Sequence, residues 1–313
     1  MSLLFSLRRM IPQRFKNGLR QRYLPWRISR LISPYLPTVA CADVGASHYP
    51  HTKWLHFLNG PRTLWLAVEP NEKNLTYVKT WAWPCHVDTC TTGLSEEGGT
   101  QTLYVTNVDT GSSLLPPEIP DSMRLRVTKL DYFFPVRERL IDTITLSQAL
   151  RGVPKDAPVF VKLDTQGTEL SILQGSMELF SEQRILGIEI ESTLLAHPLM
   201  KGAGKFWQVC EFLESQGFEL LDMKPIHAPA RSGRINSRHV TYLNECDAIF
   251  ALRQDVVMQQ SLEKRSCLLA FYTTNLFYED AVLVLGQDKE LGSYLGSQGC
   301  DVARLLKLLK AAI

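Results

Sequence analysis

The feature that most constrains the fold is an alternation of short apolar runs with segments of helical periodicity, which continues from Thr38 to Leu252. The apolar runs have the length and composition of buried strands: TVACADVG (38–45), TLWLAVEP (63–70), CHVDTC (85–90), PVFVKLD (158–164), RILGIEIE (184–191), FELLDM (218–223) and CDAIFAL (246–252). Strands that alternate with helices favour a mostly parallel sheet covered on both faces. We therefore expect an α/β, Rossmann-like doubly wound sheet over residues 38–252.

Helical spacing is present between these runs. It predicts helices over 51–58, 71–80, 168–180 and 204–217, with Leu170, Leu173 and Met177 on one side of the third. A short helix should begin near Thr145 or Ser147, because either hydroxyl can cap it. Residues 96–140 contain turn signals and strand patterns at 100–106 and 123–130, so they read as an insertion beside the sheet.

Residues 253–313 contain only helical patterns and form an expected C-terminal extension. In DVARLLKLLKAAI (301–313), the apolar residues Val302, Leu305, Leu306 and Leu309 share one face. These helices must bury that face, and we expect them to pack against their own chain at the sheet edge near the last strand. A dimer interface is the alternative.

The first 37 residues form an expected N-terminal arm that is strongly basic. Residues 1–40 hold eight Arg or Lys and no acidic residue, although the net charge of the chain is only +2. A helix from Pro12 to Leu24 would carry a narrow apolar stripe. Two interpretations stay open: a helix packed on its own domain, or peripheral contact of residues 1–36 with an anionic membrane surface or charged partner.

Composition favours a cytoplasmic protein. If the basic arm contacts a membrane, we expect the protein at the inner membrane face. The apolar runs fall short of the roughly 20 residues that span a bilayer. Seven dispersed cysteines without a CxxC pair are typical of reduced thiols. The acidic body and the lack of nucleic-acid-binding motifs argue against a nucleic-acid partner.

Three of the expected strands end in carboxylates, Asp43, Glu69 and Asp164. In a doubly wound sheet, ligands bind beyond the C-terminal ends of the strands. Gly45 follows Asp43 where the backbone must approach a ligand closely, and an acid such as Glu69 can hold the hydroxyls of a ribose. The spacing therefore predicts a site for a nucleoside-containing cofactor. Capping of helices by Asp43 and Glu69 is the structural alternative.

The first turn, DVGASHYPHTKW, lacks the GxGxxG pattern of dinucleotide sites. A cofactor without phosphates fits better, and S-adenosyl-L-methionine is such a cofactor. A nicotinamide-dependent Rossmann enzyme is the disfavoured alternative.

The segments DVGAS, LAVEPN, TTGLSEEGG, DTITLSQAL and FVKLDTQGTELSILQGS occur in order, and together they resemble the FkbM-type methyltransferases. The resemblance covers roughly 38–252 and implies a class I methyltransferase fold with the last strand antiparallel. It implies that the cofactor contacts Asp43, Gly45, Ala46, Ser47, Glu69, Asn71, Asp88, Thr92 and Leu94. Tyr49 departs from the pattern because such loops usually have a further Gly there, which raises the alternative of an inactive cofactor-binding scaffold.

Catalysis is assigned to Asp164, as orienter or proton acceptor, and to Glu189 as a second acid. Glu191 lies on the same side of its strand as Glu189, whereas Glu169 has a structural interpretation in the first turn of a helix. Lys162, inside an apolar strand, must find a partner. Glu189 and Glu191 could instead complete a divalent-metal site with Asp164, but no His or Asp spacing demands a metal, so no metal ligands are predicted.

We thus expect an S-adenosylmethionine-dependent O-methyltransferase. By family analogy its acceptor is a small molecule or glycan, methylated on a hydroxyl of a glycan or of a glycosylated or lipid-linked metabolite. The oligomeric state is left open.

Overall fold

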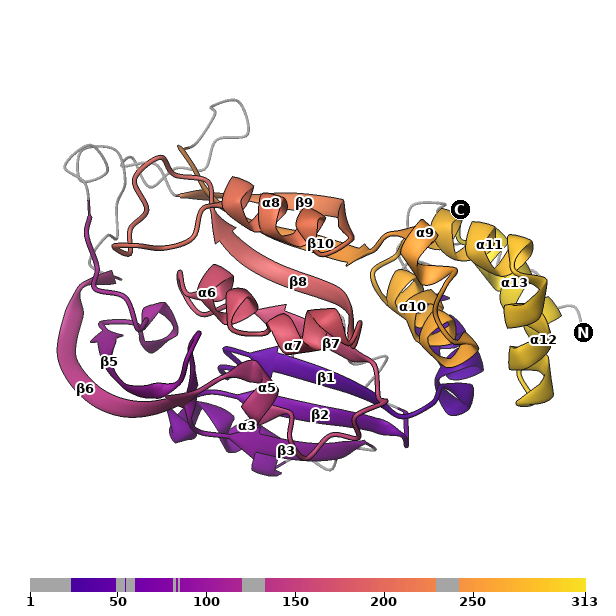
Figure 1. Cartoon of the computed structure of the whole chain (residues 1–313), viewed down its shortest axis with the longest axis horizontal. Coiled ribbons are helices and arrows are strands. Elements are labelled where there is room, and N and C mark those ends of the chain that lie inside the picture. The colour runs from indigo at the N-terminus through magenta and orange to yellow at the C-terminus, as the bar shows by residue number, and fades with distance from the viewer. Residues whose placement is uncertain are drawn as a thin grey trace, which may run out of the picture.

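A computed structural model describes residues 24–48, 54, 60–80, 83, 85–119, 133–228 and 242–313. Its main sheet has seven strands in the order β3-β2-β1-β7-β8-β10-β9 (Figure 1). Their bounds are β1 Val39–Val44, β2 Thr63–Val68, β3 His86–Cys90, β7 Val159–Leu163, β8 Ile185–Thr193, β9 Phe218–Ala228 and β10 Tyr242–Leu252. β10 is antiparallel to both neighbours, and the inner strands β2, β1, β7 and β8 are parallel. The expected class I methyltransferase sheet, with its last strand antiparallel, is confirmed.

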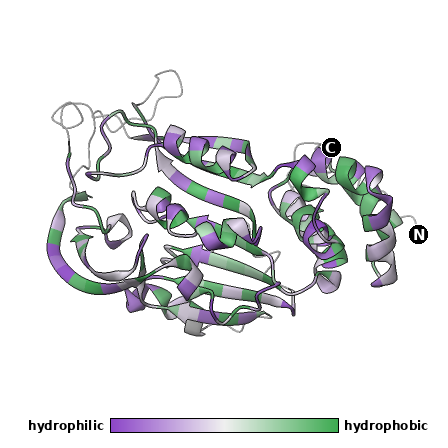
Figure 2. Cartoon of the chain, in the orientation of Figure 1, coloured by the Kyte–Doolittle hydropathy of each residue, from purple (hydrophilic) through white to green (hydrophobic). Residues whose placement is uncertain are grey.

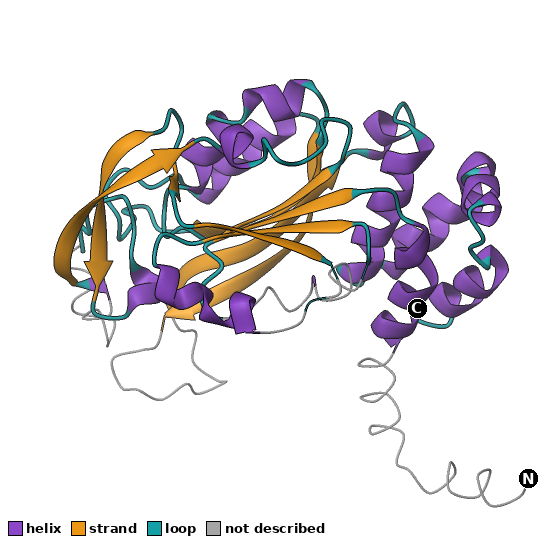
Figure 3. Ribbon diagram, turned by 90° about the horizontal axis from the view of Figure 1, so that it is seen from below, coloured by secondary structure: helices purple, strands orange, loops and turns teal. Residues whose placement is uncertain are grey.

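Helices cover both faces of the sheet (Figure 3). They are α3 Thr76–Thr80, α5 Leu146–Ala149, α6 Glu169–Gln174, α7 Met177–Ser181 and α8 Phe206–Ser215, with a 3-10 turn at Glu72–Leu75 before α3. Thr145 caps α5 as expected, because its hydroxyl accepts the Gln148 N–H while the Gln148 side chain accepts the Thr145 N–H. Of the helix expected at 51–58, only Trp54 is described, and it is buried.

The helix expected over 168–180 is two helices, α6 and α7. Gly175 lies so close to Glu96 that a Cβ there would collide with the Glu96 backbone. Helix α6 ends at Gln174, just before this contact, and α7 begins at Met177, after Gly175 and Ser176. Because the helix is interrupted, Met177 does not share a side with Leu170 and Leu173 as expected, and it is 46% exposed.

A second, three-stranded sheet lies at the end of the main sheet where β1, β2 and β7 finish (Figure 1). It consists of β4 Gly93–Leu94, β5 Gly99–Thr106 and β6 Pro135–Ile144, and we call it the wing. The strand pattern at 100–106 is confirmed as β5, and the one at 123–130 lies outside the described residues. β6 was not predicted.

The C-terminal helices gather at the opposite end of the sheet (Figure 1). They are α9 Gln254–Val257, α10 Leu262–Thr274, α11 Tyr278–Gln287, α12 Lys289–Ser297 and α13 Val302–Lys310. Hydrophobic and hydrophilic residues alternate along them (Figure 2), and Leu305 and Leu309 of α13 are fully buried. No helix in the described ranges is long and apolar enough to cross a bilayer.

The extension packs on its own chain, as expected. Phe271 of α10 stacks on Phe160 of β7 with ring centroids 4.8 Å apart. A Cβ on Gly187 of β8 would lie 2.7 Å from the same ring, so the glycine makes room for it. The contact is with the central strands rather than with the sheet edge near the last strand that we expected.

The described part of the arm, residues 24–36, also packs on the body. Ile28 and Ile32 of the helix over 24–32 are buried in the hydrophobic core. The Cys300 thiol donates to the Leu31 carbonyl at 3.3 Å, which joins this helix to the extension. For these residues the structure supports the first interpretation of the arm, a helix on its own domain. The remainder of the helix expected from Pro12 lies outside the described residues.

Candidate active site

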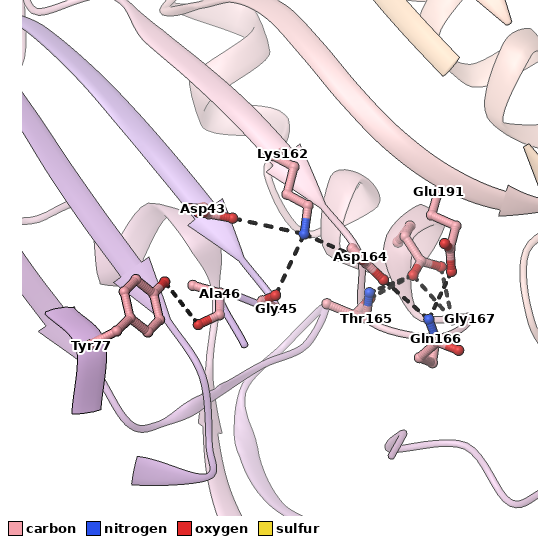
Figure 4. Close-up of polar contacts among 11 residues, drawn as sticks. Asp43, Gly45, Ala46, Tyr77, Lys162, Asp164, Thr165, Gln166, Gly167 and Glu191 are labelled. Carbon is pink, nitrogen blue, oxygen red and sulfur yellow. Dashed lines mark hydrogen bonds and ion pairs between the residues drawn. The ribbon is translucent and has the colours of Figure 1, made fainter. Parts of the chain in front are cut away.

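A row of charged side chains crosses three adjacent strands near their C-terminal ends. In the parallel register, Asp43 of β1 pairs with Lys162 of β7, and Lys162 pairs with Glu189 of β8, so the three lie on one face. Lys162 Nζ lies 3.1 Å from Asp164 Oδ2 and 3.8 Å from Asp43 Oδ1 (Figure 4). Burial opposes its charge, but Asp164 and Asp43 outweigh burial and hold the pKa of Lys162 above its usual value. These carboxylates are the partner that the buried lysine needed.

The turn after β1 is packed against the end of β7. Gly45 has a φ of +79°, and a Cβ there would collide with the Asp164 carbonyl oxygen. The N–H groups of Gly45 and Ala46 donate to the Val68 carbonyl, and the Tyr77 hydroxyl donates to the Ala46 carbonyl. The strand ends therefore meet too closely for any side chain at Gly45, a reason that the sequence alone did not reveal.

The turn after β7 is held by two carboxylates. Glu169 accepts the N–H groups of Thr165 and Gly167 at 2.7 and 2.9 Å, which gives it the expected structural role. Gln166, whose φ is +59°, donates through Nε2 to Asp164 Oδ1 at 3.1 Å and to Glu191 Oε1 at 2.7 Å (Figure 4). Asp164, 34% exposed, is thus fixed between a lysine and a glutamine.

Three acids near this turn have altered proton affinity, and burial raises the pKa of the first, Glu169, despite the N–H groups that its carboxylate accepts. Burial, reinforced by the negative charges of Asp164 and Glu245, raises the pKa of Glu191 well above its usual value. Burial, with Glu169 and Asp164, likewise raises the pKa of Glu245 on β10 to about 7. Carboxyl groups with such raised pKa values are stronger proton acceptors than ordinary surface acids.

Glu69 stands at the end of β2. Its Oε1 accepts the Asn71 N–H at 2.8 Å, and burial raises the pKa of its carboxyl more than this bond lowers it. The neighbouring Asn74 amide donates to Ser47 Oγ at 2.9 Å and ties the loop after β2 to the loop after β1. The carboxylate is therefore held in place through one of its two oxygens.

All these elements enclose a cavity of about 490 Å³, within the roughly 300–1,000 Å³ of small-molecule sites. Seven of the eleven predicted site residues line it: Gly45, Ser47, Glu69, Asn71, Leu94, Asp164 and Glu189. Asp43 and Ala46 are buried directly behind the lining. The described residues include no group of three or more His, Cys, Asp or Glu side chains arranged to hold a metal ion.

Asp88 and Thr92 are outside the lining. Asp88 pairs with Leu66 in the middle of β3, and its side chain is 67% exposed beside His86. The strand continues to Cys90 before the chain returns as β4, so Gly93 and Leu94 occupy the cavity wall instead. Asp88 precedes the strand end, whereas Asp43 and Glu69 lie at or just beyond the ends of theirs.

Sequence reasoning missed several lining residues. Arg137 and Arg139 line the cavity from β6, and Asp247 lines it from β10. The alternation in PVRERLIDTI places both arginines on one face of a strand, which could have indicated them had the strand been recognised. Tyr49 lies outside the described residues.

A sequence model of the "Methyltransferase FkbM domain" matches residues 43–220, which is more than half of the chain and includes the row of charged residues. The chain belongs to the FkbM methyltransferase family. It is therefore a methyltransferase that uses S-adenosylmethionine, rather than a nicotinamide enzyme.

The chain also matches several solved structures at low similarity. A precorrin-6y C5,15-methyltransferase from Geobacter metallireducens GS-15 is 12% identical and has a TM-score of 0.31, covering 73% of this chain and 88% of its own. A putative S-adenosylmethionine-dependent methyltransferase from Listeria monocytogenes is 9% identical, with a TM-score of 0.35 and coverage of 74% and 100%. Similarity this low carries nothing about the substrate of the FkbM domain described here. No curated protein matches the chain.

Proposed function

We propose that this FkbM-family enzyme methylates a hydroxyl group, on a glycan or on a glycosylated or lipid-linked metabolite. The observation that carries the proposal is the position of Asp164, fixed between Lys162 and Gln166 in the wall of the cavity that Glu69 also lines. The nature of the acceptor rests on the family resemblance.

The residues around the cavity fit the expected cofactor. Glu69 presents a carboxylate where a ribose can be held by hydrogen bonds to both hydroxyls. Ser47 and Asn71 offer further polar groups, and Leu94 offers an apolar surface for a base. Lys162, which also lines the cavity, donates to the Gly45 carbonyl at 3.5 Å and lies 3.8 Å from the Asp43 carboxylate. The wall holds more carboxylates than basic groups, which suits a cationic ligand.

When bound, S-adenosylmethionine supplies an electrophilic methyl group on a positively charged sulfur. The chain must then hold the acceptor hydroxyl in line and remove its proton. Lys162 and Gln166 hold the Asp164 carboxylate in one orientation, so we assign Asp164 to orienting the hydroxyl. A second carboxylate takes the proton. Glu189 and Glu191 both line the cavity and are the two candidates.

The test is transfer of radiolabelled methyl groups from S-adenosylmethionine to a cell-extract fraction, followed by identification of the labelled compound. Wild-type protein should label a hydroxyl-bearing compound. Asp164→Asn should lower turnover at least about 100-fold with a smaller effect on cofactor affinity. Comparison of Glu189→Gln with Glu191→Gln then identifies the proton acceptor. Labelling of nitrogen or carbon only, or unchanged turnover in Asp164→Asn, would reject the proposal.

We also propose that the basic residues of the arm contact anionic membranes. Eight Arg or Lys and no acid in residues 1–40 support this, and the described residues 24–36 are anchored to the body. Full-length protein should bind vesicles containing phosphatidylserine at low salt, and deletion of residues 1–22 should weaken that binding. Equal binding by both chains, or none, contradicts it.

A further inference from the structure

Two guanidinium groups line the wall of the cavity that faces the strand ends. Arg137 and Arg139 of β6 lie opposite Val105 and Leu103 of β5, and all four line the cavity. The wing therefore presents cationic side chains to the cavity from a surface that also offers two apolar contacts.

The outer face of the same strand carries two apolar residues, Val136 and Leu140, and two acidic ones, Glu138 and Asp142. Val136 is 59% exposed and Leu140 is 72% exposed, with Glu138 between them. A strand with one solvated face usually turns its polar residues outward. On β6 both faces are largely exposed instead, so the guanidinium groups of the two arginines face the cavity and can also be reached from solvent.

Within the described residues, neither arginine is paired with a carboxylate. No ion pair in the described part of the structure includes Arg137 or Arg139, although Lys162, in the wall of the same cavity, is paired with two carboxylates. Arg139 donates through one nitrogen to the Pro70 carbonyl at 3.0 Å, which holds its guanidinium beside the end of β2. Its remaining N–H groups are available, because a guanidinium has five donors.

We infer that Arg137 and Arg139 form an anion subsite, and that the methyl acceptor carries a phosphate or carboxylate group. Two planar, permanently charged forks two residues apart on one strand suit the paired oxygens of either group. Val105 and Leu103 then contact the uncharged part of the acceptor, while its hydroxyl reaches Asp164 across the cavity. This inference rests on the proposed function and narrows its substrate class.

The test is calorimetric titration of the full chain, saturated with S-adenosylhomocysteine, with three probes at constant ionic strength and without phosphate buffer. The probes are glucose, glucuronate and glucose 6-phosphate. At least one anionic sugar should bind ten or more times more tightly than glucose, and which one does so distinguishes a carboxylate from a phosphate.

Arg137→Gln and Arg139→Gln should each weaken that binding about tenfold, equivalent to about 1.4 kcal/mol, and leave binding of S-adenosylhomocysteine unchanged. Glu138→Gln, on the outward face of β6, and Arg151→Gln, exposed elsewhere, are matched controls that should change nothing. Anionic sugars that bind no better than glucose, or arginine variants that bind like wild type, would overturn the inference. So would variants that lose only S-adenosylhomocysteine, since the arginines would then belong to the cofactor.

Two further titrations separate the proposed function from the anion subsite. The first titrates S-adenosylhomocysteine alone into the chain, and failure to bind would count against the proposed function alone. The second titrates the three sugar probes into the chain without S-adenosylhomocysteine. Arginine-dependent anion binding in that experiment would still support the subsite, and its absence would overturn it.

Discussion

Lys162 is the residue on which the charge balance of the site depends. Asp43, 2% exposed, and Asp164 both lie within 4 Å of its ammonium group. Lys162→Met keeps the apolar stem but leaves the buried Asp43 carboxylate without its lysine. We expect the free energy of unfolding at pH 7 to fall by about 3–5 kcal/mol in urea titrations. The Asp43→Asn/Lys162→Met double variant should recover part of the loss. A single variant within about 1 kcal/mol of wild type would show that the ion pair does not stabilise the fold.

Glu245 should make stability depend on pH. Burial, with Glu169 and Asp164, raises the pKa of Glu245 to about 7 in the folded chain, against about 4.3 when unfolded. Between these values the folded state binds more protons, so its stability is greatest at low pH and is lost as pH rises through 7. Melting temperatures measured from pH 5 to 8 should fall, and Glu245→Gln should flatten that fall. Parallel curves for the two proteins would be inconsistent with a buried Glu245.

At the scale of elements, the sequence predicts what local pattern determines. Buried parallel strands are continuous apolar runs, so β1, β2, β7 and β8 were recognisable. β6 was missed because both its faces are largely exposed and its partner strand β5 lies some 40 residues earlier. The break at Gly175 depends on the distant backbone of Glu96, which helical periodicity cannot reveal.

For the candidate site, as for the strands and helices, the sequence predicts what local pattern determines and misses what depends on tertiary contacts. Asp43, Glu69 and Asp164 were found because each lies at or just after the end of its own strand. The row formed by Asp43, Lys162 and Glu189 requires knowing that β1, β7 and β8 are neighbours in register, which is a tertiary fact. The position of Arg137 and Arg139 in the cavity wall, and that of Asp88 outside it, likewise depend on how the strands pair.

Helix α10 should be essential to the domain although it is far from the cavity. Residues Ser266 to Thr274 are all buried, and Phe271 stacks on Phe160. Truncation after Arg253 would expose this apolar surface and the sheet beneath it. We expect insoluble or destabilised protein, measured by soluble yield and thermal melting. Phe271→Ala, which should cost about 3–5 kcal/mol, tests the same packing without a truncation. A truncated chain with full thermal stability would make the extension an independent module.

On the scale of the whole molecule, the candidate active site and the packed terminal helices lie at opposite ends of the sheet (Figure 1). The carboxyl ends of the strands and the wing enclose the cavity, and the helix over 24–32 and the C-terminal helices pack together at the other end. We propose that the chain divides into an arm (residues 1–37), a methyltransferase domain (38–252) and a C-terminal extension (253–313). The arm and the extension share one hydrophobic core.

Calorimetric titration with S-adenosylhomocysteine tests the central claim most directly, because it asks whether the strand-end cavity holds the cofactor. Wild-type protein should bind it, and Glu69→Ala should weaken binding by about 1.5–3 kcal/mol, the loss expected for a charge-assisted hydrogen bond. Asp88→Ala is the matched control, since Asp88 lies outside the cavity and its loss should leave the affinity unchanged. Absence of binding by wild type, or equal affinity in wild type and Glu69→Ala, would contradict the account.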